Sequence, residues 1–235
     1  MDVRPSKELK FPLMAGSSVP LTWRRPALEL KLGANIDKAV AAGYGGNEVY
    51  GFHALEGLEC MVERRKGFET GIAAVECRQG DDVWKFNEQN PWADQLMQAA
   101  VKRCDDVKEK SKKPSIFILE YRSGLTAAVY MLEEQVNQFA FAAKDPVVST
   151  EMWLQPVAYY NHFSGLVYYI EQLMVTSRPA YPVERTLLTA GAIDVLMDSC
   201  FEHRRIETPH LNIVYKPTEK SLYSQGPVPK PISPG

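Results

Sequence analysis

The stretch between residues 115 and 154 constrains the fold most, because it holds four strand-forming runs in close succession. The first two runs, 115–121 and 125–132, flank the turn Arg122-Ser123-Gly124 and predict a β-hairpin. Two further runs, at 136–143 and 147–154, continue the meander. The sequence therefore predicts an antiparallel sheet at the centre of the fold.

The first of these runs is apolar on both faces of the predicted strand. Phe117, Leu119 and Tyr121 fall on one face, while Ile116 and Ile118 fall on the other. A sheet that is apolar on both faces needs cover on both sides. We expect helices to cover one face and a second copy of the chain to cover the other.

Segments with helical periodicity surround the predicted sheet. Apolar residues recur at three- and four-residue steps over 48–65, 92–107, 164–176 and a closing segment that starts after Pro182. Shorter strand candidates lie at 11–16, 38–44, 72–77, 82–86 and 211–215. The expected fold class is α+β, with an open, mainly antiparallel β-sheet and helices packed on one face.

Composition and charge argue against several kinds of protein. The net charge is −2, whereas a nucleic-acid binder is usually basic. The four cysteines form no C-x-x-C pair, which predicts reduced, buried thiols and neither a disulfide nor a zinc site. The sequence has no apolar run of about 20 residues and no secretory signal at its polar start. We expect a cytoplasmic protein with no nucleic-acid or membrane partner.

Four local strings, in their order and spacing, resemble the C-terminal half of the glucose–fructose oxidoreductase and inositol dehydrogenase (Gfo/Idh/MocA) family. Residues 12–16 resemble the last strand of that family's Rossmann domain, and residues 45–56 resemble its helix with the catalytic histidine. Residues 118–127 are similar to its central hairpin, and residues 163–209 are similar to its final helices.

The resemblance implies a domain organisation. Residues 1–26 would be the end of a Rossmann domain with its linker, and residues 27–216 a substrate-binding and oligomerisation domain that forms a homodimer through its open sheet face. Residues 217–235 are rich in proline and poor in apolar groups, which predicts a flexible tail. Full-length relatives would use NAD or NADP. This sequence contains no G-x-G-x-x-G, so we expect no cofactor to be bound by this chain alone.

The resemblance makes His53 the candidate catalytic residue. Tyr50 and Glu56 lie three residues to either side of it, which places them on the same helix face as candidate substrate contacts. A histidine in a sugar pocket could accept the proton of a hydroxyl group. Alternatively, His53 is a structural residue bonded to Glu56. The aspartate that some family members carry four residues before the histidine is replaced here by Val49.

Two other places are candidate substrate contacts. Trp23 and Arg24 could stack on a sugar ring and hold a carboxylate, or they could belong to an ordinary linker with solvated arginines. His162 lies in the aromatic and polar run 159–163, which suits either a sugar-binding loop or a helix start packed on the sheet. The histidines and carboxylates show no metal-ligand spacing.

These expectations give two hypotheses for function. In the first, the chain is the substrate-binding and oligomerisation portion of an NAD(P)-dependent sugar or polyol oxidoreductase-like protein, inactive as an enzyme on its own. In the second, it is a non-catalytic binding or assembly protein derived from that family.

Overall fold

The computed structural model describes residues 8–144, 146–154 and 162–226. They contain one eight-stranded sheet, with the strand order β1-β7-β6-β2-β5-β4-β3-β8. The strands are β1 (Trp23–Arg25), β2 (Lys38–Gly43), β3 (Ile72–Gln79), β4 (Ser115–Tyr121), β5 (Thr126–Met131), β6 (Phe139–Ala143), β7 (Val148–Trp153) and β8 (Ile206–Glu207). The helices are α2 (Val49–Val62), α3 (Asp81–Gln89), α4 (Pro91–Val101), α5 (His162–Thr176) and α6 (Glu184–Glu202), with two short 3-10 helices, η1 (Val19–Leu21) and η2 (Pro209–Leu211).

The predicted hairpin and meander are confirmed. Strands β4 and β5 pair antiparallel, with Phe117 opposite Val129, and β6 pairs antiparallel with β7. The central strand β2 pairs antiparallel with β6 and parallel with β5. The remaining pairs between described strands are antiparallel. The expected class, α+β with a mainly antiparallel sheet, is therefore confirmed.

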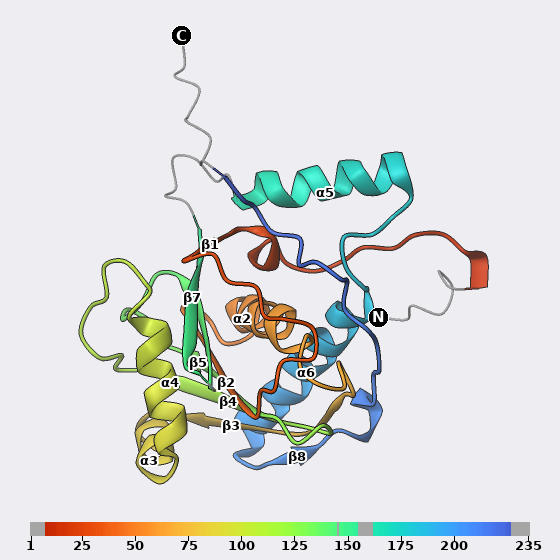
Figure 1. Ribbon diagram of the computed structural model, residues 1–235. Helices are drawn as coiled ribbons and strands as arrows, with labels where there is room; N and C mark the ends of the chain where they lie inside the picture. Colours follow the sequence, from red (N-terminus) through yellow and green to blue (C-terminus); the bar gives the residue numbers. More distant parts are fainter. Residues whose placement is uncertain (1–7, 145, 155–161, 227–235) are drawn as a thin grey trace.

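Helices α2 and α6 cover one face of the sheet. Phe117 and Val129 point to this side and share a core with Leu58 of α2 and Leu188 of α6. Figure 1 shows α2 (orange) near the middle of the molecule with α6 (blue) beside it. Because α2 has neighbours on several sides, residues 54–62 are all buried, including its charged ones.

Helices α3 and α4 cover the opposite face, which corrects the expectation of helices on one face only. Ile116 and Tyr130 of the sheet pack there against Val83 of α3 and Leu96 of α4, and Figure 1 shows both helices (yellow) across the sheet from α2. The apolar side chains on this face of the sheet are thus covered by helices of the same chain. A second copy is not needed to explain it, and the homodimer stays a prediction.

The expected strand at 82–86 is wrong, because these residues belong to α3. Gly80 has a positive φ of 61° and follows the end of β3. Asp81 and Asp82 then occupy the first turn of α3, where the helix dipole favours negative charge. The expected strands at 11–16 and 211–215 are also wrong, since neither range forms a strand.

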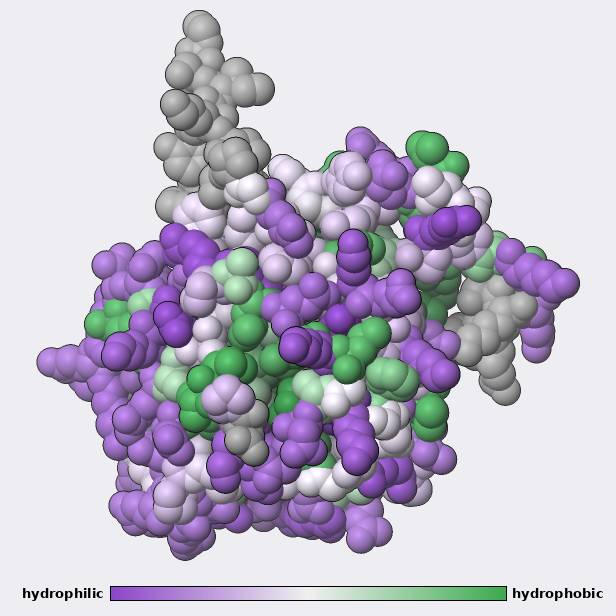
Figure 2. Space-filling model, in the orientation of Figure 1, coloured by the Kyte–Doolittle hydropathy of each residue, from purple (hydrophilic) through white to green (hydrophobic). Residues whose placement is uncertain are grey.

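Helix α5 confirms the periodicity of 164–176 but not its expected burial. Of its described residues only His162 is buried, while apolar residues such as Ile170 and Met174 are exposed. The helix lies along the top of the molecule in Figure 1. Figure 2 shows hydrophobic atoms on the surface in the region of its C-terminal end. Helical spacing identified the helix, but its neighbours decide which residues are covered.

Cys77 of β3 and Cys200 of α6 form a disulfide across 123 residues of sequence. This corrects the expectation that all four cysteines are reduced. Cys60 and Cys104 are free and buried, as expected, and burial raises the pKa of the Cys60 thiol to about 11. The disulfide could not be read from spacing, because its two cysteines meet only when α6 packs on β3.

Both ends of the described chain are tied to the main body. Strand β1 extends the sheet by pairing with β7, and η1 is buried. Arg64 of the α2 region donates hydrogen bonds of 2.9 Å to the carbonyl oxygens of Thr218 and Glu219. These bonds place the start of the expected flexible tail against the body, and residues 227–235 lie outside the described residues, so the tail stays a prediction. Within the described ranges, every helix falls short of the length and apolar character that a bilayer crossing requires.

Candidate functional site

A cavity of about 740 Å³ lies beside the N-terminal half of α2. Its walls come from α2, the segment before η1, the β6–β7 edge of the sheet and the start of α5. The lining combines aromatic rings with hydroxyl, amide, imidazole and carboxylate groups. Its main polar and aromatic residues are Tyr44, Tyr50, His53, Asn137, Trp153 and His162.

His53 is half-buried in this wall, and one of its ring nitrogens has a defined partner. Its Nδ1 lies 2.7 Å from Oγ of Ser17. The ring of Tyr50 lies on one side at 6.2 Å between centroids, and that of Phe139 lies at 6.3 Å. Burial lowers the pKa of the imidazole below its ordinary value, which favours the neutral form at neutral pH. Because Nδ1 is occupied, Nε2 is the nitrogen left for a ligand.

The backbone around Gly16 places Ser17 against α2. Gly16 has a φ of +126°, and a Cβ there would lie only 2.6 Å from Oγ1 of Thr186 and 2.7 Å from a Glu56 oxygen. The neighbouring carbonyl of Ala15 accepts 2.8 Å hydrogen bonds from Thr186 and Tyr181 of the α6 region. The apolar run that ends in glycine is therefore a docking segment for α6, and it fixes the position of Ser17.

Glu56 lies outside the cavity, although it was expected to be a substrate contact. Its side chain is fully buried, and it accepts a hydrogen bond of 2.5 Å from Thr189 of α6. Burial raises its pKa, with partial compensation from Arg185 and Thr189. The alternative in which Glu56 bonds to His53 is not observed, since the recorded partner of His53 is Ser17.

His162 lies in the same cavity as His53, as does Phe163. Burial lowers the pKa of His162, and the charge of His53 lowers it further, which shows that the two imidazoles are electrostatic neighbours. The structure thus brings His162 of α5 to the same cavity as His53 and Tyr50 of α2. Residues 159–161, expected to belong to the same binding edge, lie outside the described residues.

Trp23 and Arg24 line a different cavity, of about 540 Å³, between β1 and the C-terminal segment. Arg24 is buried, donates 2.9 Å to the carbonyl of Leu28, and stacks at 4.2 Å on the ring of Tyr223. Trp153 lines both cavities. These two expected contacts therefore do not line the cavity of His53.

Several cavity residues gave no pattern in the sequence. Asp105, Asp106 and Asn137 lie in irregular segments and reach the cavity through the packing of α4 and β6. Gln138 has a structural role. Its amide donates a hydrogen bond of 2.9 Å to the backbone of Leu154 and accepts one of 2.7 Å from it. Turn composition indicates loops but does not say which loops meet.

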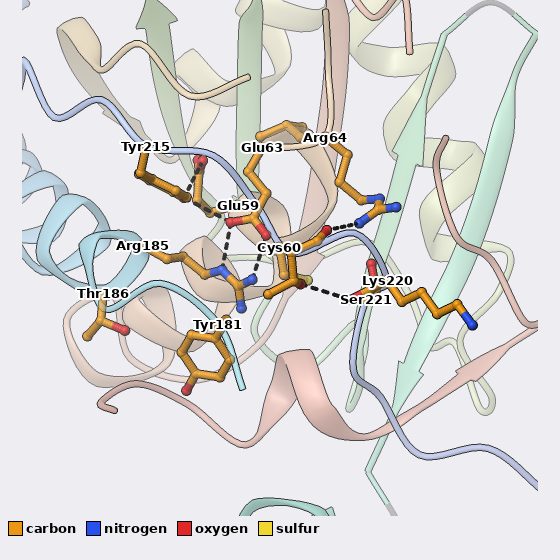
Figure 3. Close-up of polar contacts among 12 residues, drawn as sticks. Glu59, Cys60, Glu63, Arg64, Tyr181, Arg185, Thr186, Tyr215, Lys220 and Ser221 are labelled. Atoms are coloured by element: carbon orange, nitrogen blue, oxygen red, sulfur yellow. Dashed lines mark hydrogen bonds and ion pairs between the residues drawn. The ribbon is translucent and has the colours of Figure 1, made fainter. Parts of the chain in front are cut away.

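A second group of polar residues, the buried charge cluster, lies behind the cavity in the core. Figure 3 shows Arg185 pointing at Glu63, with Tyr215 and Glu59 close by. Glu59 accepts 2.8 Å from Tyr121 and 3.2 Å from Tyr215. Burial, followed by the charge of Glu69, raises the pKa of Glu59 well above its ordinary range. The cluster is enclosed, so it belongs to the core and does not face a ligand.

The described residues do not fit a metal or a dinucleotide. They contain no group of three or more histidine, cysteine or acidic side chains that could hold a metal ion. The one parallel pair among the described strands is β2 with β5. Strand β2 ends at Gly43 and leads through Gly45 and Gly46 into α2, but these glycines do not have the G-x-G-x-x-G spacing. NAD or NADP remains an expectation for full-length relatives only.

No family model matches the sequence, and no curated protein matches it. Solved structures with a similar arrangement include GenD2 from gentamicin A biosynthesis in complex with NAD, with a TM-score of 0.48, 11% identity, and coverage of 75% of this chain and 56% of that one. Another is myo-inositol 2-dehydrogenase from Lactobacillus plantarum, with a TM-score of 0.47, 9% identity, and coverage of 74% and 57%. A third is aldose-aldose oxidoreductase from Caulobacter crescentus, with a TM-score of 0.41, 15% identity, and coverage of 74% and 56%.

The chain spans little more than half the length of these solved structures. Scores of this size at such low identity do not show membership of a family. The function is therefore argued from the cavity itself.

Proposed function

We propose that this chain binds a polyol or sugar in the cavity of His53, as the substrate-binding part of an oxidoreductase-like protein. The observation that carries the proposal is the position of His53, which is held by Ser17 and lies beside the aromatic rings of Tyr50 and Phe139. Ring faces suit the C–H side of a sugar, and polar side chains suit its hydroxyl groups. The resemblance of residues 45–56 to a catalytic-histidine helix supports the oxidoreductase context.

The side chains that line the cavity favour a neutral, hydroxyl-rich ligand. Asn137 offers an amide, while Asp105 and Asp106 offer carboxylate oxygens that can accept hydrogen bonds from hydroxyl groups. The same carboxylates disfavour an anionic ligand. A volume of about 740 Å³ lies in the range of small-molecule sites.

Calorimetric titration of the full chain with erythritol, xylitol and glucose tests the proposal. We expect saturable binding in the millimolar range, roughly −4 kcal/mol, which His53→Gln and Tyr50→Ala weaken. Phe201→Ala is the matched control, because Phe201 is strongly exposed at the end of α6 and does not line the cavity. Absence of saturable binding, or equal binding by all variants, would overturn the proposal.

A non-catalytic binding protein is the second candidate. Position 49 favours this candidate, because a largely exposed valine stands where some relatives have an aspartate. The partner of the histidine in this chain is a serine instead of a carboxylate. Production of reduced nicotinamide by the chain, mixed with NAD or NADP and the bound polyol, would exclude this second candidate.

A further inference from the structure

The partners of the Ser17 hydroxyl decide which nitrogen of His53 carries its hydrogen. Oγ of Ser17 accepts a hydrogen bond of 3.0 Å from the backbone N–H of Val19, and it lies 2.7 Å from Nδ1 of His53. Ser17 itself is buried. Among the described residues, His53 is the only recorded group to which the Ser17 hydroxyl can give its own hydrogen.

The two tautomers of His53 are therefore unequal. If Nδ1 carried the hydrogen, Oγ of Ser17 would accept two hydrogen bonds, and its own hydrogen would be buried with no acceptor. If Nδ1 accepts instead, both groups of Ser17 are satisfied. Buried donors without partners are strongly disfavoured, so the second arrangement is the stable one. The hydrogen of the neutral ring then lies on Nε2.

We propose that Ser17 is a positioning residue that holds neutral His53 in the Nε2–H form, so that the cavity presents a hydrogen-bond donor and prefers a ligand with a carbonyl oxygen at this point. The ligand preference rests on the proposed function. The tautomer assignment rests on geometry alone. It differs from the expectation that His53 accepts a hydroxyl proton, because an Nε2 that already carries hydrogen has no free lone pair. The lowered pKa of His53 agrees with a neutral ring.

The preferred ligand class follows from the hydrogen-bond donors and acceptors of the ligand and of His53. A ketone oxygen can only accept hydrogen bonds, so the N–H of His53 satisfies it and no second partner is required. A hydroxyl in the same place can also accept, but its own hydrogen then requires a second acceptor close to Nε2. Burial alone lowers the pKa of His53, whereas an adjacent carboxylate would raise it, so Asp105 and Asp106 do not supply that acceptor at this point. A keto-sugar should therefore bind more tightly than the polyol of the same chain length.

A proton–nitrogen correlation spectrum of the full chain with isotope-labelled histidine reads the tautomer directly. The chain has four histidines, and His53→Gln assigns the signal of His53 by its loss. We expect the Nε2–H pattern in the wild type, a mixture of tautomers in Ser17→Ala, and recovery in Ser17→Thr, which keeps the hydroxyl. Ser18→Ala is the matched control, because Ser18 lines the cavity but has no recorded bond to His53.

An Nδ1–H pattern in the wild type would overturn the inference, as would an unchanged pattern in folded Ser17→Ala. Should Ser17→Ala fail to fold, the wild-type and Ser17→Thr spectra still decide the question.

Calorimetry with erythrulose and erythritol, which differ at one carbon, tests the ligand. We expect erythrulose to bind about 5-fold more tightly, the worth of one neutral hydrogen bond, and Ser17→Ala to reduce that ratio. Equal or tighter binding of erythritol would overturn the carbonyl preference. If neither compound binds while the Nε2–H pattern is seen, the proposed function fails and the role of Ser17 stands.

Discussion

Arg185 of α6 donates two hydrogen bonds to the carboxylate of Glu63 at the end of α2, from Nε at 2.8 Å and from a terminal nitrogen at 2.5 Å. Both side chains are almost completely buried. The two-point contact fixes the orientation of the guanidinium as well as its distance. It thereby ties together the two helices that pack on one face of the sheet.

Removing one partner of this pair should be strongly destabilising. Arg185→Met leaves the Glu63 carboxylate buried without its cation, and we expect a loss of about 3–5 kcal/mol in the free energy of unfolding. Urea unfolding measures this loss. Arg205→Met is the control, because it breaks the exposed pair with Glu120 and should cost below about 1 kcal/mol. Equal small losses in both variants would contradict the importance of the buried pair.

Glu59 should make stability depend on pH. Its folded-state pKa is raised above the unfolded value by burial and then by Glu69. Its stabilising contribution is therefore complete below the unfolded pKa and is lost as pH rises through the folded pKa. We expect Glu59→Gln to lessen the decline in free energy of unfolding as pH rises above the unfolded pKa of the carboxyl group.

Glu120 supplies a control of opposite sign for the Glu59 experiment. A hydrogen bond from Arg205 lowers the pKa of Glu120, so its contribution is present above the unfolded pKa and is lost as pH falls. Glu120→Gln should thus lower stability above the unfolded pKa, and its difference from the wild type should disappear toward acidic pH. Parallel pH profiles for wild type and Glu59→Gln would show that Glu59 does not titrate as described.

The disulfide should be measurable in two ways. Thiol titration in denaturant should count two free thiols, those of Cys60 and Cys104, before reduction and four after it. Cys200→Ser should cost about 2–5 kcal/mol, because Cys77 and Cys200 close a long loop. Cys104→Ser leaves the bond intact and serves as the control. Four thiols in unreduced protein would rule the disulfide out.

Arg64 should hold the C-terminal segment in place. Arg64→Ala removes its bonds to the carbonyls of Thr218 and Glu219. We expect trypsin to cleave the variant after Lys220 several-fold faster than the wild type, since proteolysis follows local opening. Lys66→Ala, at an exposed position nearby, should leave cleavage unchanged. Mass spectrometry of the fragments identifies the site of cleavage.

The candidate site could be predicted from the sequence in part. His53 and Tyr50 were found from one helix and a family resemblance, and they do share the cavity with His162. Glu56 was misplaced, because i+3 spacing brings residues to one side of a helix without saying whether that side faces a cavity or a neighbouring helix. Ser17 could not have been found, since its link to His53 spans 36 residues and depends on the docking of Gly16.

Local patterns by themselves determined the hairpin, the meander and the positions of α2, α4, α5 and α6, because periodicity and turn chemistry act within a few residues. Only the tertiary structure decided that helices cover both faces of the sheet, that Cys77 meets Cys200, and that charged residues of α2 lie in the core. Each of these depends on contacts between segments far apart in the chain. A buried carboxylate is stable only where another segment brings it a partner, and that partner is invisible in the sequence around it.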